Sequence, residues 1–412
     1  MNKLLTNALV HRPNGEVKPG QILISDDTIA GVYEPGEAPP RNPDLVLDLQ
    51  GMVVFPSLIN AHDHLYDTFW PQPAVAGKYL NWYEWDADYH ASQIYRQKQM
   101  LSTADLYALG MYRNLLSGVG LIVDHFPREI VLTFANKPFI SLLENFFLAH
   151  SVSSHKLEWG NGLREEYAQA RGVVPFIIHI EEGFDPEITQ EMETLHRLGA
   201  LGENTVLVNG PGLSSADVEL IATRHCSFVW SPTSTQRLFQ TIPPIIKLLE
   251  AGVPMALGTD SAVSGAATLF DELRAFRQLA EAEWPGRFSP ADILKLVTSA
   301  PAAIFRVDKA YGSIEVGKGA NFLIFPDAKN DPYASFFELT PRTVSMVVHR
   351  GVLAYGDERY RSVCSVRFDH YSEVLVEGVP KLVWGKPIQL LERIEHKLGE
   401  PRRFPFLPVN EL

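Results

Sequence analysis

Cysteine is scarce in this chain, with only Cys226 and Cys364 among 412 residues. Two thiols are too few for the disulfide framework of a small secreted domain or for a cysteine-based metal site. We therefore expect a reducing compartment, the cytoplasm. The N-terminus agrees, because its short apolar run is interrupted by Thr6 and Asn7 and lacks the pattern of a secretory signal.

Long hydrophobic runs are also missing. No apolar stretch reaches the roughly 18 residues that span a bilayer, because charged residues such as Glu144 interrupt the longest candidates. Basic charge is in deficit, since 36 Lys and Arg stand against 49 Asp and Glu, and both signs are dispersed along a chain of formal net charge −13. These features argue against a membrane partner and against a nucleic-acid partner.

Repeats are absent as well, and what remains is a long chain with 46% hydrophobic residues. Over residues 56–308, short apolar runs alternate with stretches of helical periodicity, which predicts parallel strands joined by helices. The length of this segment is close to the roughly 250 residues of an eight-stranded β/α barrel. The predicted strands include 120–124, 175–178, 205–208, 227–230 and 253–257. The predicted helices include 187–199, 215–225, 243–251 and 269–283.

The two ends of the chain have β character. Residues 1–55 contain short predicted strands and residues 309–364 return to the same pattern, so we expect both segments to meet in one small β-sandwich. The predicted fold class is α/β, a (β/α)8 TIM barrel with a β-sandwich domain formed by the N- and C-terminal segments. Residues 365–412 are expected to wrap the surface or a neighbouring subunit. A doubly wound open sheet is the competing architecture, but no Gly-rich phosphate turn follows a strand.

Two histidines, one residue apart, end the first apolar run of the barrel segment. Side chains at i and i+2 of a strand point the same way, so His62 and His64 can converge on one metal ion. A pair of this spacing also arises by chance in a chain with 13 histidines. The metal hypothesis therefore depends on further ligands at the ends of later strands.

Later predicted strands do end in such groups. His179 ends one run, Glu182 follows three residues on, and Asp260 ends another run after two small residues that permit close approach. Three histidines and one aspartate suit one divalent metal, Zn²⁺ first and also Fe²⁺ or Mn²⁺, which activates a water. Glu182 would move the proton from that water to the leaving side of the substrate. The alternatives are a helix N-cap for Asp260 and a solvated loop carboxylate for Glu182.

These motifs resemble the amidohydrolase superfamily. The likeness is carried by residues 51–64, 179–183, 252–261, 299–303 and 312–320, and it covers about residues 1–355. The H-x-x-E pairing is similar to the mononuclear branch that holds cytosine deaminase, guanine deaminase and the triazine hydrolases. The resemblance implies that Glu182 shuttles protons and that the metal ligands are His62, His64, His179 and Asp260.

Two positions depart from the family pattern. The family usually carries a histidine at the end of the next strand, where this chain has Asn209, and residues 232–235 read Pro-Thr-Ser-Thr where the family more often has Ser-Asn. Asn209 can donate a hydrogen bond to a substrate, but it cannot become cationic or shuttle a proton. The departures point to an unusual substrate or to a weakened enzyme.

The loop after the first barrel strand is dense in aromatic residues, which could stack on a planar ligand at the barrel mouth. The alternative for this loop is a packed element or a dimer contact. His125 could reach the cavity or serve as a core histidine, Ser261 is expected to orient Asp260, and His150 and His155 are candidates for the pocket wall. The predicted substrate contacts are Trp70, Trp82, Trp85, His125, Asn209 and Ser261.

The favoured hypothesis is a metal-dependent, deaminase-like hydrolase that acts on a carbon–nitrogen bond, other than a peptide bond, of a small planar, cyclic nitrogen compound. Glu182, Asp260 and Asn209 are its expected catalytic residues, with Asp260 as acceptor of a second proton. A cyclic amidase of the same fold is one alternative. A non-catalytic ligand-binding or scaffold protein is another. We expect a small-molecule substrate and a homodimer.

Overall fold

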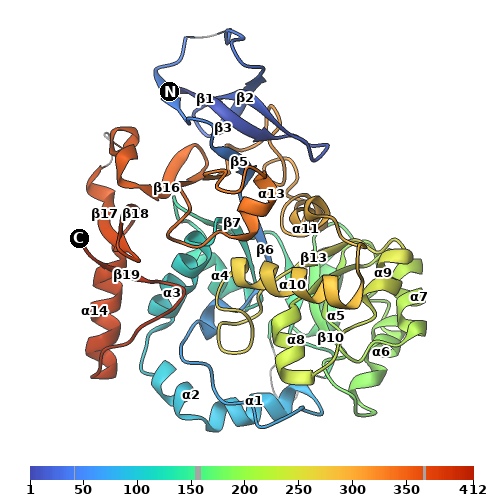
Figure 1. The fold of residues 1–412 in the computed structure, drawn as a ribbon. Helices are drawn as coiled ribbons and strands as arrows, with labels where there is room; N and C mark the ends of the chain where they lie inside the picture. Colours follow the sequence, from blue (N-terminus) through green and yellow to red (C-terminus); the bar gives the residue numbers. More distant parts are fainter. Residues whose placement is uncertain (41, 154–158, 365–367) are drawn as a thin grey trace.

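Both ends of the chain enter one eleven-stranded sheet, which lies beside a barrel of parallel strands (Figure 1). The computed structural model describes residues 1–40, 42–153, 159–364 and 368–412. In this sheet β14 pairs antiparallel with β5 and β5 pairs parallel with β1, so the N- and C-terminal segments lie side by side. The strands of the sheet are β1 (Asn2–His11), β2 (Val17–Ser25), β3 (Thr28–Tyr33), β4 (Leu45–Asp48), β5 (Val53–Pro56), β14 (Phe322–Phe325), β15 (Met346–His349), β16 (Val352–Asp357), β17 (Tyr371–Val376), β18 (Val379–Trp384) and β19 (Val409–Glu411).

The segment after residue 367 folds back onto its own chain. It supplies three strands of the sheet and the helix α14 (Pro387–Leu398), which packs on α3 (Thr103–Leu115). Arg393 Nε and Lys397 Nζ of α14 donate to the Asp105 carboxylate in the first turn of α3, at 2.7 and 2.5 Å. Residues that were expected to wrap a surface therefore continue the sheet and clamp one end of a barrel helix.

Eight strands build the barrel in two hydrogen-bonded groups, β6 to β8 and β9 to β13. All pairings within the two groups are parallel, and a bridge between Asp63 and Asp260 joins the end of β6 to the segment that follows β13. We call this junction the seam. The barrel strands are β6 (Leu58–Asp63), β7 (Val119–Asp124), β8 (Ser141–Leu142), β9 (Phe147–Ala149), β10 (Phe176–Ile180), β11 (Thr205–Asn209), β12 (Ser227–Trp230) and β13 (Met255–Leu257).

One β/α unit of the barrel is incomplete. Only residues 143–146 separate β8 from β9, whereas parallel neighbours need a crossover of a dozen or more residues. Accordingly, no ladder joins β8 to β9 within the part of the chain that the structure describes. The regular alternation predicted for residues 56–308 is interrupted at this point, because the intervening segment is too short to hold a helix.

Several helices begin at a residue whose side chain caps the first turn. Ser102 before α3, Ser214 before α7 and Ser289 before α11 each form a capping box with an aspartate three residues on. Of these three helices, α7 spans Ser215–Thr223 and α11 spans Pro290–Lys295. The remaining helices are α1 (Trp82–Ala91), α2 (Gln93–Lys98), α4 (Arg128–Phe134), α5 (Leu163–Ala170), α6 (Glu191–Arg197), α8 (Pro232–Phe239), α9 (Ile245–Glu250), α10 (Leu269–Glu283), α12 (Ser299–Ile304) and α13 (Pro332–Phe337). Short 3-10 turns lie at Leu65–Asp67, Ile188–Gln190, Glu358–Cys364 and Phe368–His370.

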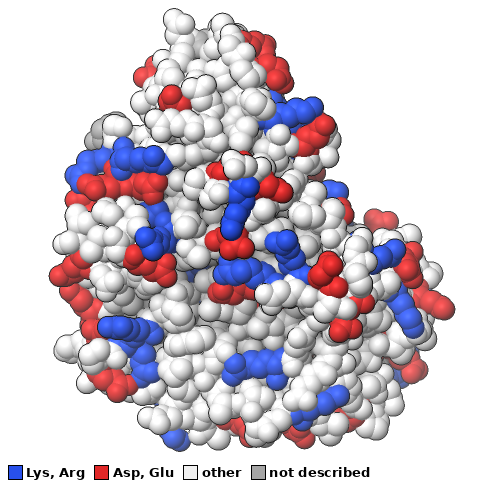
Figure 2. Space-filling model, in the orientation of Figure 1, with Lys and Arg blue, Asp and Glu red and all other residues white. Residues whose placement is uncertain are grey.

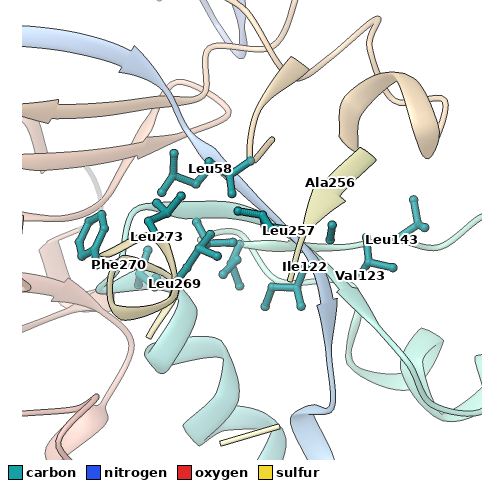
Figure 3. Close-up of a cluster of buried hydrophobic side chains, with 14 of the residues drawn as sticks. Leu58, Ile122, Val123, Leu143, Ala256, Leu257, Leu269, Phe270 and Leu273 are labelled. Carbon is teal, nitrogen blue, oxygen red and sulfur yellow. The ribbon is translucent and has the colours of Figure 1, made fainter. Parts of the chain in front are cut away.

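Apolar side chains fill the barrel around the seam. Figure 3 shows residues of β6, β7 and β13 packed with residues of α10. Leu58 and Leu257 are at most 1% exposed, and Phe270 of α10 is 2% exposed. This packing fixes the strand ends, where the polar residues of the site begin. The labelled members are Leu58, Ile122, Val123, Leu143, Ala256, Leu257, Leu269, Phe270 and Leu273.

The surface agrees with the dispersed charge of the sequence. On the face drawn in Figure 2, Lys and Arg alternate with Asp and Glu, and neither sign forms a continuous field. Among the described residues, no helix is both long enough and apolar enough to cross a bilayer.

Candidate metal and catalytic site

Three histidines converge at the mouth of the barrel. His62 and His64 stand at the end of β6 and His179 stands in β10, and one ring nitrogen of each lies within 4.8 Å of the others. The Nε2 atoms of His62 and His179 are 3.1 Å apart. Asp260 Oδ1 lies 3.4 Å from His64 Nε2 and 3.8 Å from His62 Nε2. Four side chains from three strand ends therefore face one point.

The seam brings Asp260 to the histidines. The His62 carbonyl accepts the backbone N–H groups of Thr259 and Asp260 at 2.9 and 3.1 Å. Gly258 touches the same strand so closely that an added Cβ would lie 2.6 Å from His62 backbone atoms. The small residues before Asp260 predict a close approach of this segment to a neighbouring strand, and the structure shows that approach at His62.

Three strand ends at the site have left-handed backbone conformations. The φ angles are +46° at Glu181, +68° at Asn209 and +54° at Asp260. Residues other than glycine adopt this region rarely, with Asn and Asp most tolerant. Such strain persists where surrounding structure fixes it, often at functional sites.

A buried polar network lies behind the His62–His64 pair. The Asp63 carboxylate accepts bonds from Arg113 Nη1 and Asn114 Nδ2, both at 2.7 Å. Arg113 also donates to the carbonyls of Ala266 and Ala267 at 2.8 and 2.7 Å. Helix α3 thus ties β6 to the loop that follows Asp260.

The donor set fits a divalent metal. Burial lowers the pKa of His62 and of His64, and it lowers the pKa of His179 to about 4, so the imidazoles are neutral, as ligation requires. His179 Nδ1 donates to the His150 carbonyl at 3.0 Å, which directs the Nε2 lone pair toward the other ligands. Neutral imidazoles with a carboxylate and no thiolate suit Zn²⁺, Fe²⁺ or Mn²⁺.

Two partners hold the Asp260 carboxylate. The backbone N–H of Ser261 donates to Oδ1 at 2.8 Å, and the Ser234 hydroxyl donates to Oδ2. Ser261 therefore orients Asp260 through its backbone, while its hydroxyl pairs with Ser264 at 2.6 Å. The run 232–235, noted above only as a departure from the family pattern, supplies the hydroxyl partner.

Glu182 lies beside the ligands on the cavity wall and is 8% exposed. Burial, together with the nearby Asp260 carboxylate, raises the pKa of Glu182 to about 8, although a hydrogen bond from Asn209 Nδ2 at 2.7 Å acts in the opposite direction. A carboxyl group with a pKa near neutrality can both take and give a proton at working pH.

A cavity of about 230 Å³ opens in front of these groups. Two stacked aromatic pairs stand in its wall, Tyr66 with Phe126 at 5.1 Å and Trp85 with Tyr89 at 5.5 Å between ring centroids. Lys98, 1% exposed, is paired with Asp67 and lies 4.1 Å from the Tyr66 ring centroid. Other lining residues are His64, Trp82, Asp86, His90, Tyr95, His150, Trp159, His179, Glu182, Leu238, Phe239, Asp260, Ser261, Val263 and Ser264.

The predicted substrate contacts divide into two groups. Trp82, Trp85 and Ser261 line the cavity. Trp70, His125 and Asn209 are not among its described lining residues. His155 falls within residues 154–158, outside the described part of the chain. The roles of all these residues stay predictions.

The residues outside the lining have identifiable positions. The carbonyl of Trp70 accepts a bond from Arg402 at 3.4 Å. His125 is buried behind the ligands, with its ring centroid 4.2 Å from that of His179.

Sequence reasoning missed several cavity residues. Tyr89, Tyr95 and Lys98 follow the aromatic loop on α1 and α2, where helical spacing gave no sign of which face meets the cavity. The signal that could have found them is the continued aromatic density through residue 95. Trp159 and Phe126 come from other loops, and no pattern in the sequence indicates that they line the cavity.

The family comparison agrees with this geometry. Residues 175–354, which include His179, Glu182 and Asp260, match the family described as Amidohydrolase family. These residues are an amidohydrolase domain. The predicted family resemblance is thereby confirmed.

Curated relatives cover most of the chain. A 5-methylthioadenosine/S-adenosylhomocysteine deaminase from Syntrophobacter fumaroxidans is 26% identical, over 78% of this chain and 84% of the relative. A 5′-deoxyadenosine deaminase from Methanosarcina acetivorans is 24% identical, over 75% of this chain and 80% of the relative.

Solved structures share the fold. An atrazine chlorohydrolase from Arthrobacter aurescens complexed with zinc has a TM-score of 0.71 at 16% identity and covers 96% of this chain and 100% of its own. An adenosine deaminase from Xanthomonas campestris with bound zinc has a TM-score of 0.69 at 20% identity and covers 85% of this chain and 92% of its own. The predicted fold class, an α/β barrel with an accompanying β domain, is confirmed.

Proposed function

We propose that the protein is a zinc-dependent hydrolase that deaminates a planar nitrogen heterocycle, in a compound of the nucleoside type. One observation carries the proposal: His62, His64, His179 and Asp260 face a single point, and Glu182 stands in the wall of the same cavity. The names of the curated relatives, deaminases of adenine nucleoside derivatives, support the nucleoside class.

The proposed roles follow from the positions of the side chains. The three histidines and Asp260 would hold the metal, which would supply a nucleophile at neutral pH by lowering the pKa of water. Glu182 takes a proton from the attacking water and passes it to the leaving nitrogen, because its raised pKa makes both directions accessible. Asp260 accepts the second proton of the water and returns it to a ring nitrogen of the product, so that ammonia leaves and both carboxylates are restored.

The cavity favours a flat and uncharged ring. Its aromatic walls offer faces on which a heterocycle stacks. Its described lining holds one lysine, which is already paired with Asp67, and three further carboxyl groups, those of Asp86, Glu182 and Asp260. Apart from the proposed metal, a phosphate group would therefore find no unpaired lysine or arginine in the described lining, so we expect nucleosides or bases to be preferred over nucleotides.

A substrate panel tests the proposal. The zinc-loaded protein is incubated with 5′-deoxyadenosine, 5′-methylthioadenosine, S-adenosylhomocysteine, guanine, cytosine and a triazine, while ammonia release and ultraviolet change are followed. We expect ammonia from at least one compound and none after chelation. Absence of turnover on every compound, with zinc bound, would overturn the proposal.

The released product separates the alternatives. A cyclic amidase would open the ring of an added hydantoin and form a carboxylate without free ammonia. A non-catalytic protein would bind a compound from the panel and leave it unchanged. Plasma mass spectrometry on protein purified without added metal tests zinc against iron and manganese.

Location and assembly belong to the same proposal. We place the protein in the cytoplasm and expect a homodimer. Light scattering on the purified protein tests the dimer directly. A monomer at working concentrations would overturn the dimer and leave the proposed chemistry untouched.

A further inference from the structure

Asn209 ends β11 at a position where the resembled family usually carries a histidine, and both polar atoms of its side chain are hydrogen bonded. Its Nδ2 donates to Glu182 Oε1 at 2.7 Å, and its Oδ1 accepts the backbone N–H of Ser231 at 3.1 Å. The Ser231 bond fixes which end of the amide is the donor, because a backbone N–H can pair only with the oxygen. The N–H group is therefore aimed at Glu182.

Asn209 is buried outside the described lining of the cavity. The side chain is 1% exposed and does not belong to the described lining of the cavity, whereas Glu182 does. The backbone at Asn209 has a φ of +68°, a conformation that asparagine tolerates better than most residues. Strain of this kind at a strand end persists when a neighbouring contact fixes it.

We infer that Asn209 is a positioning residue that holds the Glu182 carboxylate for proton transfer and does not contact the substrate. The inference rests on the proposed function, since it assigns Asn209 a part in the work of Glu182. It replaces the hydrogen bond to substrate that the sequence predicted for Asn209 with a hydrogen bond to the base.

Two variants separate this role from a structural one. Asn209→Asp keeps the side-chain shape and tolerates the backbone conformation but has no N–H to donate. Asn209→Gly also accepts the positive φ and removes the side chain. The control is Asn204→Asp, at the residue that precedes β11 and so at the other end of this strand from Asn209. Asn204 Nδ2 donates to the Val174 carbonyl at 2.9 Å.

The first measurement needs no turnover. In crystal structures of the two Asn209 variants, we expect the Glu182 carboxylate to leave its present position or to occupy several rotamers, while Asn204→Asp leaves it in place. A Glu182 carboxylate that stays fixed in both Asn209 variants overturns the inference.

The second measurement uses 5′-deoxyadenosine as the probe substrate. We expect both Asn209 variants to lose about 10- to 100-fold in kcat, the size expected for a hydrogen bond to a charged group, with KM within about twofold. The Asn204 variant should change neither. A rise in KM at unchanged kcat would show that Asn209 binds substrate instead. If 5′-deoxyadenosine is not turned over, the choice of this substrate fails, and the crystal structures alone decide the role of Asn209.

Discussion

The two halves of the site are fixed in different ways. At the seam, His62, His64 and Asp260 lie beside the buried Asp63–Arg113 ion pair and are tied together by backbone bonds. Across the cavity, Glu182 is held by a neutral amide of Asn209. The β6 side of the proposed metal site is thus anchored by a charged network, and the proposed proton-transfer residue is held by an uncharged group.

This difference suits the proposed tasks. Proposed ligands should keep one geometry, and a charged network that is fully paired and dry holds a geometry firmly. A base must gain and lose a proton, and a neutral donor next to Glu182 leaves that change possible at moderate pH. A cation in the place of Asn209 would hold Glu182 ionised and reduce its ability to accept the proton.

The largest expected effect tests the proton-moving half. Glu182→Gln removes the base but keeps the size of the side chain, so kcat should fall by about 10²- to 10⁴-fold while the metal content stays unchanged. The control is Glu181→Gln at the next position, whose carboxylate accepts the Met192 N–H at 3.3 Å and is outside the described cavity lining. Steady-state kinetics and metal analysis make the measurement. Full activity in the Glu182 variant would contradict the proposed role of Glu182 as the base.

The next effect tests the charged half. Arg113→Met leaves Asp63 as a buried, unpaired charge, which should cost about 3–5 kcal/mol of unfolding free energy. The double variant Asp63→Asn, Arg113→Met removes both charges and should recover part of that loss. Lys295→Met, which breaks an exposed pair with Asp292, should cost less than about 1 kcal/mol. Denaturant unfolding measures all three, and equal losses in the buried and exposed pairs would contradict the prediction.

A smaller effect is expected for the hydroxyl that holds Asp260. Ser234→Ala removes that donor, and loss of a partner that orients a metal ligand typically weakens metal affinity by about 10- to 100-fold. Ser335→Ala is matched, since Ser335 is also buried and donates to an aspartate, Asp327, at 2.9 Å, away from the site. Competition with a chelator gives the affinities. Zinc affinity that is the same in both variants would exclude a role for Ser234.

The smallest effect concerns a buried acid beside the seam. Burial raises the pKa of Glu272 from 4.5 to about 8. Since the folded protein binds this proton more tightly than the unfolded chain, the contribution of Glu272 to stability is lost as pH rises from about 4.5 to 8.

Glu272→Gln should therefore equal the parent near pH 4.5 and exceed its stability by about 1 kcal/mol at pH 8.5, the low end of the cost of an unsatisfied buried polar group. Thermal unfolding of the metal-free protein at the two pH values measures the difference. Glu283→Gln, exposed on the same helix, should show no such dependence. A gain of equal size at both pH values would mean that the charge of Glu272 is not its cause.

Much of the fold was predictable because it depends on periodicity. The helix expected over 269–283 is α10 with the same bounds, and the strand expected over 205–208 is β11 with one more residue. The gathering of His62, His64, His179 and Asp260 follows from a rule that the carboxyl ends of barrel strands share one mouth.

Other features had no local pattern. The direction of the Asn209 amide depends on Ser231, which is 22 residues away, and the pairing of Asp63 depends on Arg113 in a helix with no sign of its partner. The missing helix between β8 and β9 was hidden because short apolar runs do not show where one strand ends. Tertiary partners of this kind lie beyond any single stretch of sequence.

Helix α3 turns the C-terminal segment into a remote support of the site. Its first turn carries Asp105, which α14 grips through Arg393 and Lys397, and its last turn carries Arg113, which grips Asp63. Helix α3 is thus held at its N-terminal end by α14 and contacts Asp63 at its C-terminal end. A protein shortened at residue 386 would lose the contacts of α14 with Asp105, and the resulting displacement of α3 would act on the proposed metal ligands through Asp63, some 320 residues earlier in the sequence.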